Sequence, residues 1–344
     1  MTTDKLNPTR LNPRAWLYPT PRGLYCEPGD FYVDPAVAVN RAVITHGHGD
    51  HARPGHKNAL ATPETLAIMR ALFQDMPDTR QQPLEYGESL RIGDVDVGLV
   101  PAGHILGSAQ VVLEHRGQRI VVSGDYKRRP DATCLPFEPV LCDVFITEAT
   151  FALPVFHHPS DAGEIGKLLQ SLRTFPESTH LVGVYALGKC QRVITLLRAA
   201  GYDKRIWLHG SLAALCRLYQ EQGIDLGDIA LVSDAILETF KGAIALCPPS
   251  AIADRWSRRF NEPIAAMASG WMSVRARARQ RGAELPLIIS DHADWSELTQ
   301  TLKDVGAPKV WVTHGREEAL VHQARSMGIE AEALHLAGRE EEGA

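Results

Sequence analysis

The sequence predicts an α/β fold in which a second, smaller α/β unit is inserted into the first domain. Three observations support this prediction: short apolar runs that each end at a polar residue, a middle region where strands and helices alternate, and chemically active side chains on both sides of that region. We expect a first domain formed by residues 1–151 and 286–344, with the inserted unit at 152–285.

The composition is that of an ordinary globular protein. Of the 344 residues, 44% are hydrophobic and 22% are charged, and the formal net charge is −5. These values argue against a disordered, collagen-like or coiled-coil chain and against bulk electrostatic attraction to nucleic acid. The 14 His stand out and direct attention to metal chemistry. The 6 Cys are scattered without a C-x-x-C pair, so neither a disulfide framework nor a thiolate zinc site is indicated.

The sequence contains neither a recognisable targeting segment nor a membrane-spanning run. The N-terminal stretch MTTDKLNPTRLNPRAW is polar and rich in Pro, without the apolar segment of a signal peptide. No apolar run elsewhere reaches the roughly 20 residues of a membrane span. From these two features we expect a cytoplasmic protein with no membrane partner.

The first and last parts of the chain contain short β-rich runs that polar, chemically active residues follow at once. Apolar runs of this length, bounded by Gly or Pro, are typical of buried strands. Because residues at strand ends can meet at one rim of a sheet, we expect the side chains after these strands to form one composite site. The predicted strands are AVIT at 42–45, VDVGLV at 95–100, RIVVS at 119–123, VFIT at 144–147, LIIS at 287–290 and KVWVT at 309–313.

The middle region alternates between strands and helices, which predicts a small parallel α/β unit. Helical segments are predicted at 189–200 and 211–222, and Gly223 is a stop signal for the second. The polar residues before and after this unit would then belong to one site. The predicted strands are LVGVY at 181–185, IWLH at 206–209 and AIALC at 243–247.

The strongest motif is THGHGDHARPGH, a Gly-punctuated stretch that follows a predicted strand. Imidazole and carboxylate ligands suit Zn²⁺ or Mn²⁺, and four of them so close together suit two neighbouring ions better than one. Gly47 and Gly49 permit the tight backbone path that this arrangement needs. A polar surface loop is the alternative, but it leaves the H-x-H-x-D-H spacing unexplained. The potential ligands are His46, His48, Asp50 and His51.

At these residues the sequence resembles the metallo-β-lactamase superfamily, whose fold is an αββα sandwich with a dinuclear site at one edge. Further motifs resemble the β-CASP nuclease branch, in which a cap domain is inserted between a Glu motif and later His motifs. In chain order they are PAGHILGSAQ, SGDY, TEATF, SDHADW and VTHG. YALGKCQ and ASGWM are similar to cap segments of that branch. More narrowly, the compact length, FYVDP, ASGWM and the Arg-rich stretch resemble the bacterial ligase-associated DNA exonucleases.

The resemblance implies two divalent ions, Zn²⁺ or alternatively Mn²⁺, and a role for each matching residue. Asp34 would orient a ligand His from outside the ligand set. Taken alone, His104 or His314 would more often be a structural His, and Asp34 or Asp125 could be a turn residue. The implied ligands are His46, His48 and His104 for one ion, Asp50, His51 and His314 for the second, and Asp125 bridging both.

The implied reaction is hydrolysis of a phosphodiester bond that leaves a 5′-phosphate and a 3′-hydroxyl. Two ions about 3.5–4 Å apart lower the pKa of a shared water and neutralise phosphate oxygens as charge develops. The leaving oxygen needs a proton, for which His292 is the candidate acid, held and kept cationic by Glu148. Asp50 and Asp125 complete the predicted catalytic group. A solvated strand-end carboxylate is the alternative interpretation of Glu148.

Substrate contacts are expected in the middle region. Where a strand meets a helix in YALGKCQR, backbone N–H groups and a Lys make a good phosphate site. In SVRARARQRG, alternate Arg would share one face of an extended segment and could follow a nucleic-acid backbone, whereas a helix would spread them around its surface. Trp256 and Trp271 are candidates for base stacking, with a place in the core as the alternative. The predicted substrate-binding residues are Lys189, Gln191, Arg192, Arg275, Arg277 and Arg279.

Two features favour different nucleic acids. In the β-CASP branch a His at the position of His314 is more typical of RNA-processing members. The closer resemblance to ligase-associated exonucleases instead implies single-stranded or end-frayed DNA, a role in DNA repair, and a DNA ligase or helicase system as partner. We predict a DNA exonuclease, with an RNA-processing ribonuclease as the alternative.

Two rival classes share this fold, a thioester or lactone hydrolase and a non-catalytic scaffold. The cap segments and the pair formed by Glu148 and His292 argue against the first, since a small substrate would not need them. The second would have a decayed metal site, whereas every ligand position is intact in this sequence.

Overall fold

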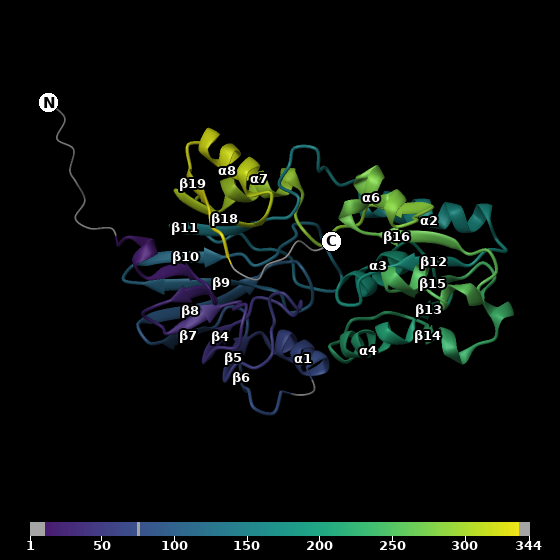
Figure 1. Ribbon diagram of the computed structural model, residues 1–344, viewed down its shortest axis with the longest axis horizontal. Coiled ribbons are helices and arrows are strands. Elements are labelled where there is room, and N and C mark those ends of the chain that lie inside the picture. The colour runs from purple at the N-terminus through teal and green to yellow at the C-terminus, as the bar shows by residue number, and fades with distance from the viewer. Residues whose placement is uncertain (1–10, 74–75, 337–344) are drawn as a thin grey trace.

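The computed structural model describes residues 11–73 and 76–336; residues 1–10 and 337–344, which include the ends of the predicted first domain, lie outside the described part. It forms two lobes placed side by side along the long axis (Figure 1). The sandwich lobe, on the left in that view, is built on sheets A and B. The sheet-C lobe, on the right, is built from the middle of the chain. This mixed architecture agrees with the predicted α/β class.

Sheets A and B face each other across one core. Strand β8 (Val95–Pro101) alternates strictly between buried and partly exposed residues, so that Val95, Val97 and Leu99 point inward. Leu24, Phe31 and other residues of sheet A pack against them. The strands of sheet A are, in spatial order, β1 (Leu17–Thr20), β2 (Gly23–Cys26), β3 (Phe31–Val33), β4 (Arg41–Val43), β5 (Asn58–Ala61) and β6 (Arg80–Pro83). The strands of sheet B are, in spatial order, β19 (Glu330–Ala333), β18 (Lys309–Gly315), β11 (Val144–Ala149), β10 (Gln118–Val122), β9 (Ala109–His115), β8 and β7 (Ser89–Ile92).

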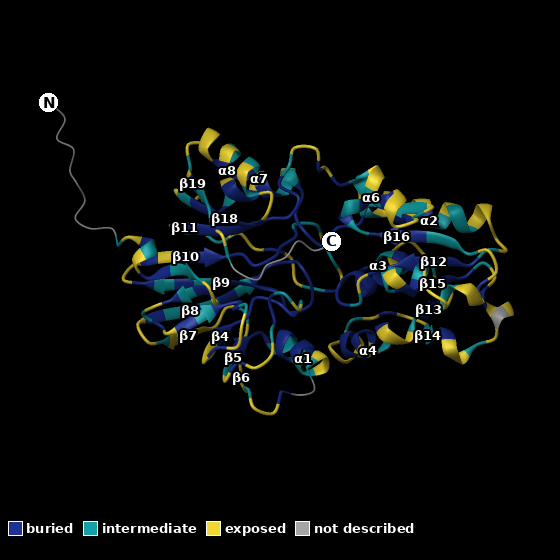
Figure 2. Cartoon of the chain, viewed as in Figure 1, coloured by how far each residue is buried: buried dark blue, intermediate teal, exposed yellow. Residues whose placement is uncertain are grey.

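Helices cover the outer faces of this sandwich and make it four layers deep. Helix α1 (Pro63–Leu72) packs Leu66 and Met69 on sheet A. Helices α7 (Trp295–Asp304) and α8 (Glu317–Ser326) cover the outer face of sheet B. Asp294 and Glu297 form a capping box that fixes the start of α7 directly after the polar segment at 290–294. The exposed residues lie mainly on the outer sides of the helices and at the loops (Figure 2).

Sheet C is entirely parallel, as the alternation of strands and helices predicts. Its central strand β12 (His180–Gly183) is buried along its whole length, as expected for a parallel strand that is covered on both faces. One face shares an apolar cluster with Ile68 and Ile105 of the sandwich lobe, so the two lobes are packed together. The other strands are β14 (Ile229–Leu231), β13 (Ile206–Leu208), β15 (Ile244–Cys247), β16 (Ile264–Ala268) and β17 (Leu285–Leu287), and the α-helices are α2 (Asp161–Thr174), α3 (Lys189–Ala199), α4 (Ala213–Glu221), α5 (Pro249–Ile252) and α6 (Arg275–Gln280).

Short 3-10 helices complete the described elements. One of them, Gly270–Ser273, holds part of the ASGWM segment between β16 and α6. None of the helices in the described ranges is long and apolar enough to cross a membrane. The remaining 3-10 helices are Pro13–Ala15, Gly210–Leu212, Val232–Asp234, Leu237–Phe240 and Ser257–Arg259.

Two predicted elements differ from the structure. The run LIIS was predicted as a strand over 287–290, but β17 ends at Leu287 in sheet C, and the chain leaves the sheet at 288–290. The extended interpretation of SVRARARQRG is wrong, because Arg275–Gln280 is helical. Ala and Arg are strong helix formers, Ala278 is buried, and Gly282 at a φ of +65° follows the end of the helix.

Candidate metal centre

The predicted metal ligands converge at one rim of the sandwich lobe. They lie in the loop after β4, in the turn after β8, directly after β10 and at the end of β18. The close approach of these loops requires Gly124, which has a φ of +57° and whose added Cβ would lie 2.8 Å from Thr45. His314 is itself in the left-handed region, with a φ of +61°. The strand-end convergence predicted from the sequence is therefore present.

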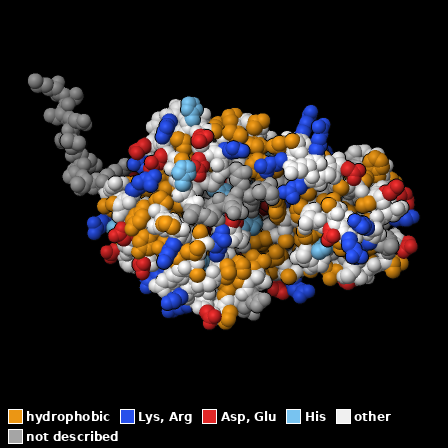
Figure 3. All heavy atoms as spheres, viewed as in Figure 1, with side chains coloured by type: hydrophobic (Ala, Val, Ile, Leu, Met, Phe, Trp, Pro, Cys, Tyr) orange, Lys and Arg blue, Asp and Glu red, His pale blue; other side chains and the backbone are white. Residues whose placement is uncertain are grey.

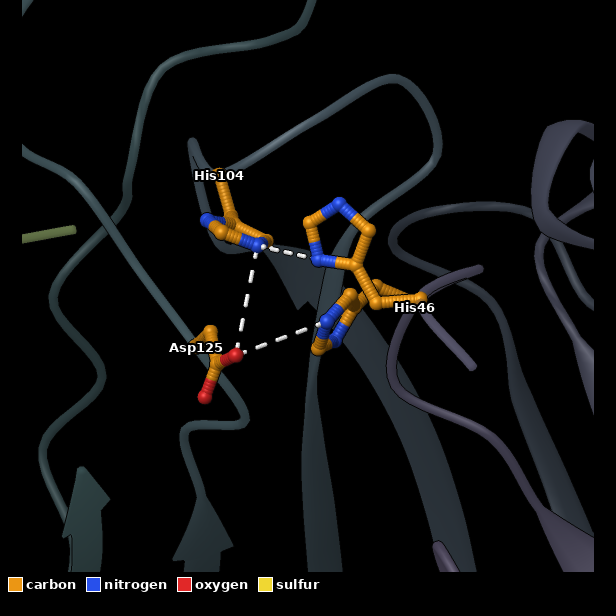
Figure 4. Close-up of side chains that lie close together, drawn as sticks. His46, His104 and Asp125 are labelled. Carbon is orange, nitrogen blue, oxygen red and sulfur yellow. Dashed lines mark hydrogen bonds and ion pairs between the residues drawn. The ribbon is translucent and has the colours of Figure 1, made fainter. Parts of the chain in front are cut away.

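The first predicted ligand group forms a tight cluster. The ligand atoms of His46, His48, His104 and Asp125 all lie within 4.8 Å of one another. Asp125 Oδ2 is 3.5 Å from His46 Nε2 and 4.0 Å from His104 Nε2, which is 3.0 Å from His48 Nδ1 (Figure 4). Within the described residues, His46 Nε2 and both Asp125 oxygens are buried without a hydrogen-bond partner. Converging nitrogen and oxygen atoms of this kind fit a divalent cation.

The second predicted ligand group lies on the other side of Asp125. His51 Nε2 is 3.4 Å from Asp125 Oδ2 and 3.5 Å from Asp50 Oδ2. The ring of His314 lies 6.0 Å from the ring of His51, between centroids. Asp125 thus stands between the two groups, where a bridging carboxylate would be.

Hydrogen bonds on the far side of each imidazole set its orientation. His51 Nδ1 lies 2.8 Å from Asp34 Oδ2, and Thr45 donates to the same carboxylate through its backbone N–H and its hydroxyl. His104 Nδ1 lies 2.7 Å from the carbonyl oxygen of Asp291. Because a carboxylate or a carbonyl accepts, the ring nitrogen facing it carries the hydrogen, and the other nitrogen directs its lone pair at the cluster. Asp34 therefore has the geometry expected of it.

Burial and charge put the ligands in the forms that metal binding requires. Burial lowers the pKa of His46 and His104 well below the ordinary value, which keeps both rings neutral. Burial by itself would raise the pKa of Asp125, but His51, His314 and His46 around the carboxylate outweigh it and hold that pKa well below its ordinary value. His46 and His104 are thus held neutral beside an ionised Asp125 carboxylate.

Glu148 and His292 form a second, adjoining cluster with Asp125. His292 Nδ1 lies 3.1 and 3.0 Å from the two carboxylate oxygens of Glu148, and the backbone N–H of Tyr126 donates to the same carboxylate at 2.8 Å. The ring centroids of His292 and His104 are 4.7 Å apart. Glu148 is 0% exposed, so its interpretation as a solvated strand-end carboxylate is wrong.

A cavity of about 130 Å³ opens beside this centre and reaches the sheet-C lobe. Its wall combines charged and aromatic side chains, so it could receive both a phosphate and a base. Side chains that line it include His48, Phe151, Tyr185, Lys189, Trp271 and His292.

Of the three substrate-binding residues predicted in YALGKCQR, the structure brings Lys189 to the cavity. The Gln191 side chain accepts from the backbone N–H of Gly188 and donates to the carbonyl of Ala186, so it caps α3 instead. Arg192 is 1% exposed and its guanidinium lies among carboxylates. The prediction that Gln191 and Arg192 bind substrate is corrected on this ground: Gln191 is used to cap its own helix, and Arg192 is buried against carboxylates.

The predicted Arg strip does not form a continuous track. Arg275 and Arg279 are exposed on α6, whereas the guanidinium of Arg277 stacks 3.9 Å from the centroid of the Trp271 ring. Trp256 packs on Phe260 and His209. Lys and Arg side chains project at the top of the right-hand lobe, where Figure 1 places α6 (Figure 3).

Sequence reasoning missed the groups that hold the ligands from behind. The carbonyl oxygens of Leu187 and Asp291 face His48 and His104, and a backbone acceptor leaves no signature in residue type. The side chain of Asp291 also escaped notice, although it directly precedes His292 in the SDHADW motif.

No protein-family model matches the chain. The chain is 28% identical over 320 residues to a probable DNA ligase of Opitutus terrae, covering 91% of this chain and 30% of that protein. It is 24% identical over 376 residues to Ribonuclease TTHA0252 of Thermus thermophilus, covering 87% and 86% of the two chains. The chain therefore spans about a third of the first relative and most of the second.

One solved structure supports the fold alone. A protein of unknown function from Enterococcus faecalis V583 superposes with a TM-score of 0.58 at 12% identity, over 87% of this chain and 80% of that one. Fold and site together describe an α/β protein with a His- and Asp-rich cluster at the rim of a two-sheet sandwich. More particularly, the chain is a relative of the metallo-β-lactamase nucleases of the β-CASP branch, which confirms the resemblance seen in its motifs.

Proposed function

We propose that this chain is a metal-dependent nuclease, and specifically a DNA exonuclease that acts on single-stranded or frayed ends during repair. Its products would carry a 5′-phosphate and a 3′-hydroxyl. The observation that carries the proposal is the buried convergence of ligand atoms on Asp125 beside the pair formed by Glu148 and His292. The similarity of 91% of the chain to part of a probable DNA ligase supports a DNA substrate and a ligase as partner. The proposed place of action is the cytoplasm.

Two divalent ions fit the donor set. Zn²⁺ is the first candidate and Mn²⁺ the second, because imidazole and carboxylate donors suit both. When bound, such ions supply Lewis-acid stabilisation of phosphate charge and activate water for attack on phosphorus. The proposed ligands are His46, His48 and His104 for one ion, Asp50, His51 and His314 for the other, and Asp125 for both.

The residues beside the metal ligands have their own tasks in this proposal. His292 would give a proton from its Nε2 to the leaving oxygen, because Glu148 holds its Nδ1 on the opposite side. The Glu148 carboxylate stabilises the positive charge that the ring carries before this transfer. Lys189 lines the cavity wall and pairs with Asp291 through its Nζ, so it would direct its remaining N–H groups at a substrate phosphate, and Trp271 would stack against a base.

A ribonuclease of the same branch is the second candidate. It is favoured by the Thermus relative, which is named a ribonuclease and matches over 86% of its length, and by the His at position 314. Both candidates use the same metal centre, so the substrate assay separates them.

The test uses end-labelled single-stranded and duplex DNA beside RNA of matching sequence, each with Zn²⁺ and with Mn²⁺. We expect stepwise shortening of single-stranded DNA that Asp125→Ala abolishes. Cleavage of RNA alone would replace the proposal with the ribonuclease, and internal cuts would replace the exonuclease mode. Turnover of a thioester or lactone with both nucleic acids left intact would contradict a nuclease altogether.

A further inference from the structure

Two of the three histidines at one predicted metal position are supported by a different part of the molecule from the one that supports His46 and His51. His51 is held by Asp34, and Thr45 lies 3.0 Å from His46 Nδ1, all within the sandwich lobe. His48 and His104, which belong to the same ion, are instead held by carbonyl oxygens at the boundary with the sheet-C lobe. Leu187, whose oxygen is 3.3 Å from His48 Nε2, stands directly before the N-cap of α3.

The second of these carbonyls, that of Asp291, is fixed through its own side chain. Lys189 Nζ lies 2.7 Å from Asp291 Oδ2, and Arg192 Nη1 lies 3.0 Å from Asp291 Oδ1. Arg192 also donates to the backbone carbonyl of Ser290. Both cations come from the first turn of α3. The N-terminal end of this helix therefore places the Leu187 carbonyl beside His48 and also fixes Asp291, whose carbonyl faces His104.

The same arginine connects to His104 by a second route. Lys127 Nζ donates to the backbone carbonyl of His104 at 3.0 Å and pairs with Asp131 Oδ2 at 2.7 Å. Arg192 Nε lies 3.5 Å from that same oxygen. The side chains of Lys127, Asp131 and Arg192 are each at most 2% exposed, so solvent screens this cluster weakly.

Arg192 is anchored to the sheet-C lobe as well. Its Nη2 lies 2.5 Å from Oδ2 of Asp161, the first residue of α2. The Arg192 guanidinium thus pairs with Asp161 of α2, with Asp291 in the segment between β17 and α7, and with Asp131 of the sandwich lobe. A planar guanidinium can hold three carboxylates in a fixed geometry, which the single ammonium of a Lys cannot.

We propose that Arg192 and Asp291 are positioning residues that couple the docking of the sheet-C lobe to the metal position formed by His48 and His104. This inference rests on the two-ion site of the proposed function. The other position, formed by His51, Asp50 and His314, depends on Asp34 of the sandwich lobe and is independent of the coupling. Loosening the cluster should therefore weaken the binding of one ion and leave the other unchanged.

The test measures stepwise Zn²⁺ binding by the full chain in competition with a chromogenic chelator, and the absorption spectrum of the Co²⁺-loaded form. The variants are Arg192→Lys and Asp291→Asn, which keep the size of the side chain and, for the first, its charge. Arg198→Lys is the matched control, because Arg198 lies on the same helix and, within the described part of the chain, its guanidinium donates to the backbone carbonyls of Leu226, Tyr202, Lys204 and Asp228, away from the metal centre.

We expect one of the two Zn²⁺ equivalents to weaken about 10- to 100-fold in both variants, with a changed Co²⁺ spectrum, and neither to change in Arg198→Lys. If the two residues only stabilise the fold, the variants should have a lower melting temperature, but the affinities for the first and second Zn²⁺ should not change relative to each other. Folded variants that keep both affinities, or lose both equally, would overturn the positioning role while leaving the proposed function intact. A wild-type chain that binds fewer than two equivalents would contradict both proposals.

Discussion

His292 stands at the junction between the metal cluster and the open cavity. Its Nδ1 is hydrogen-bonded to Glu148, its ring packs near His104, and the side chain lines the cavity wall. A residue so placed can deliver a proton to a substrate without holding a metal. Its role is thus separable by experiment from that of the neighbouring ligands.

We expect His292→Ala to retain both metal equivalents and to lose about 10²- to 10⁴-fold in kcat, the range that a general acid contributes. Nuclease rates and metal content measured on the same preparation check this. His157→Ala is the control, because His157 is an exposed neighbour that bonds to Ser296. An unchanged rate in His292→Ala would remove the residue from the mechanism.

A buried histidine outside the metal centre adds a pH dependence. Burial, reinforced by Arg129, lowers the pKa of His158 to about 3. In the unfolded chain the His158 ring is protonated below about pH 6.5, whereas in the folded protein it stays neutral down to about pH 3. The free energy of unfolding is therefore highest above pH 6.5 and falls as the pH drops from 6.5 toward 3. We expect His158→Leu to flatten the fall in unfolding free energy by up to about 1.4 kcal/mol per pH unit in this window.

Urea unfolding at several pH values, in the presence of a chelator, measures this slope. His322→Leu is the control, since His322 is exposed on α8. A slope in His158→Leu equal to that of the wild type would show that His158 is protonated alike in both states.

At the scale of elements, the N-terminal turn of α3 forms a close contact between the lobes. Gly188 begins it with a φ of +84°, and an added Cβ would lie 2.3 Å from Cγ2 of Ile105 in the sandwich lobe. Both the backbone conformation and the contact therefore require glycine. The loop that carries His104 is thus pressed directly against the helix that holds Lys189 and Arg192.

Gly188→Ala tests this junction. Gly201→Ala is its matched control, because Gly201 has a φ of +80° but nothing lies within 4 Å of the added Cβ. Both variants should lose about 1–2 kcal/mol of stability to backbone strain. Only Gly188→Ala should also weaken Zn²⁺ binding. Equal metal affinities in the two variants would mean that disturbing the contact with Ile105 does not change the metal centre.

The short helices after β16 form the aromatic side of the cavity. Trp271 packs on Phe151 and carries the guanidinium of Arg277 on its ring. A helical α6 thus places one arginine against the cavity wall and leaves Arg275 and Arg279 outside.

We expect Trp271→Ala to raise the KM for a single-stranded oligonucleotide roughly 5- to 150-fold, which corresponds to the loss of one base stack of about 1–3 kcal/mol. Metal affinity should not change. Steady-state kinetics on the oligonucleotide provide the measurement, with Trp256→Ala as the control. A KM of Trp271→Ala equal to that of the wild type would show that the Trp271 ring contributes to packing and does not bind the oligonucleotide.

At the scale of the whole molecule, the candidate metal centre lies where two lobes meet, and residues far apart in the chain are joined there. Arg192 and Asp291 are 99 positions apart and lie within hydrogen-bond distance. The apolar cluster that fills the sheet-C lobe continues into Ile68 and Ile105. The metal centre is therefore built on the rigid sandwich but closed by the packing of the second lobe.

The sequence by itself predicted the candidate metal centre, because the four potential ligands between His46 and His51 lie on one short loop and their spacing is a local property. It also determined the strand ends that carry His104, Asp125 and His314. Only the tertiary structure decided that the Arg192 guanidinium faces the carboxylates of Asp131, Asp161 and Asp291. The reason is physical: burial and pairing of these side chains depend on how two lobes dock, and no local pattern in the chain encodes that contact.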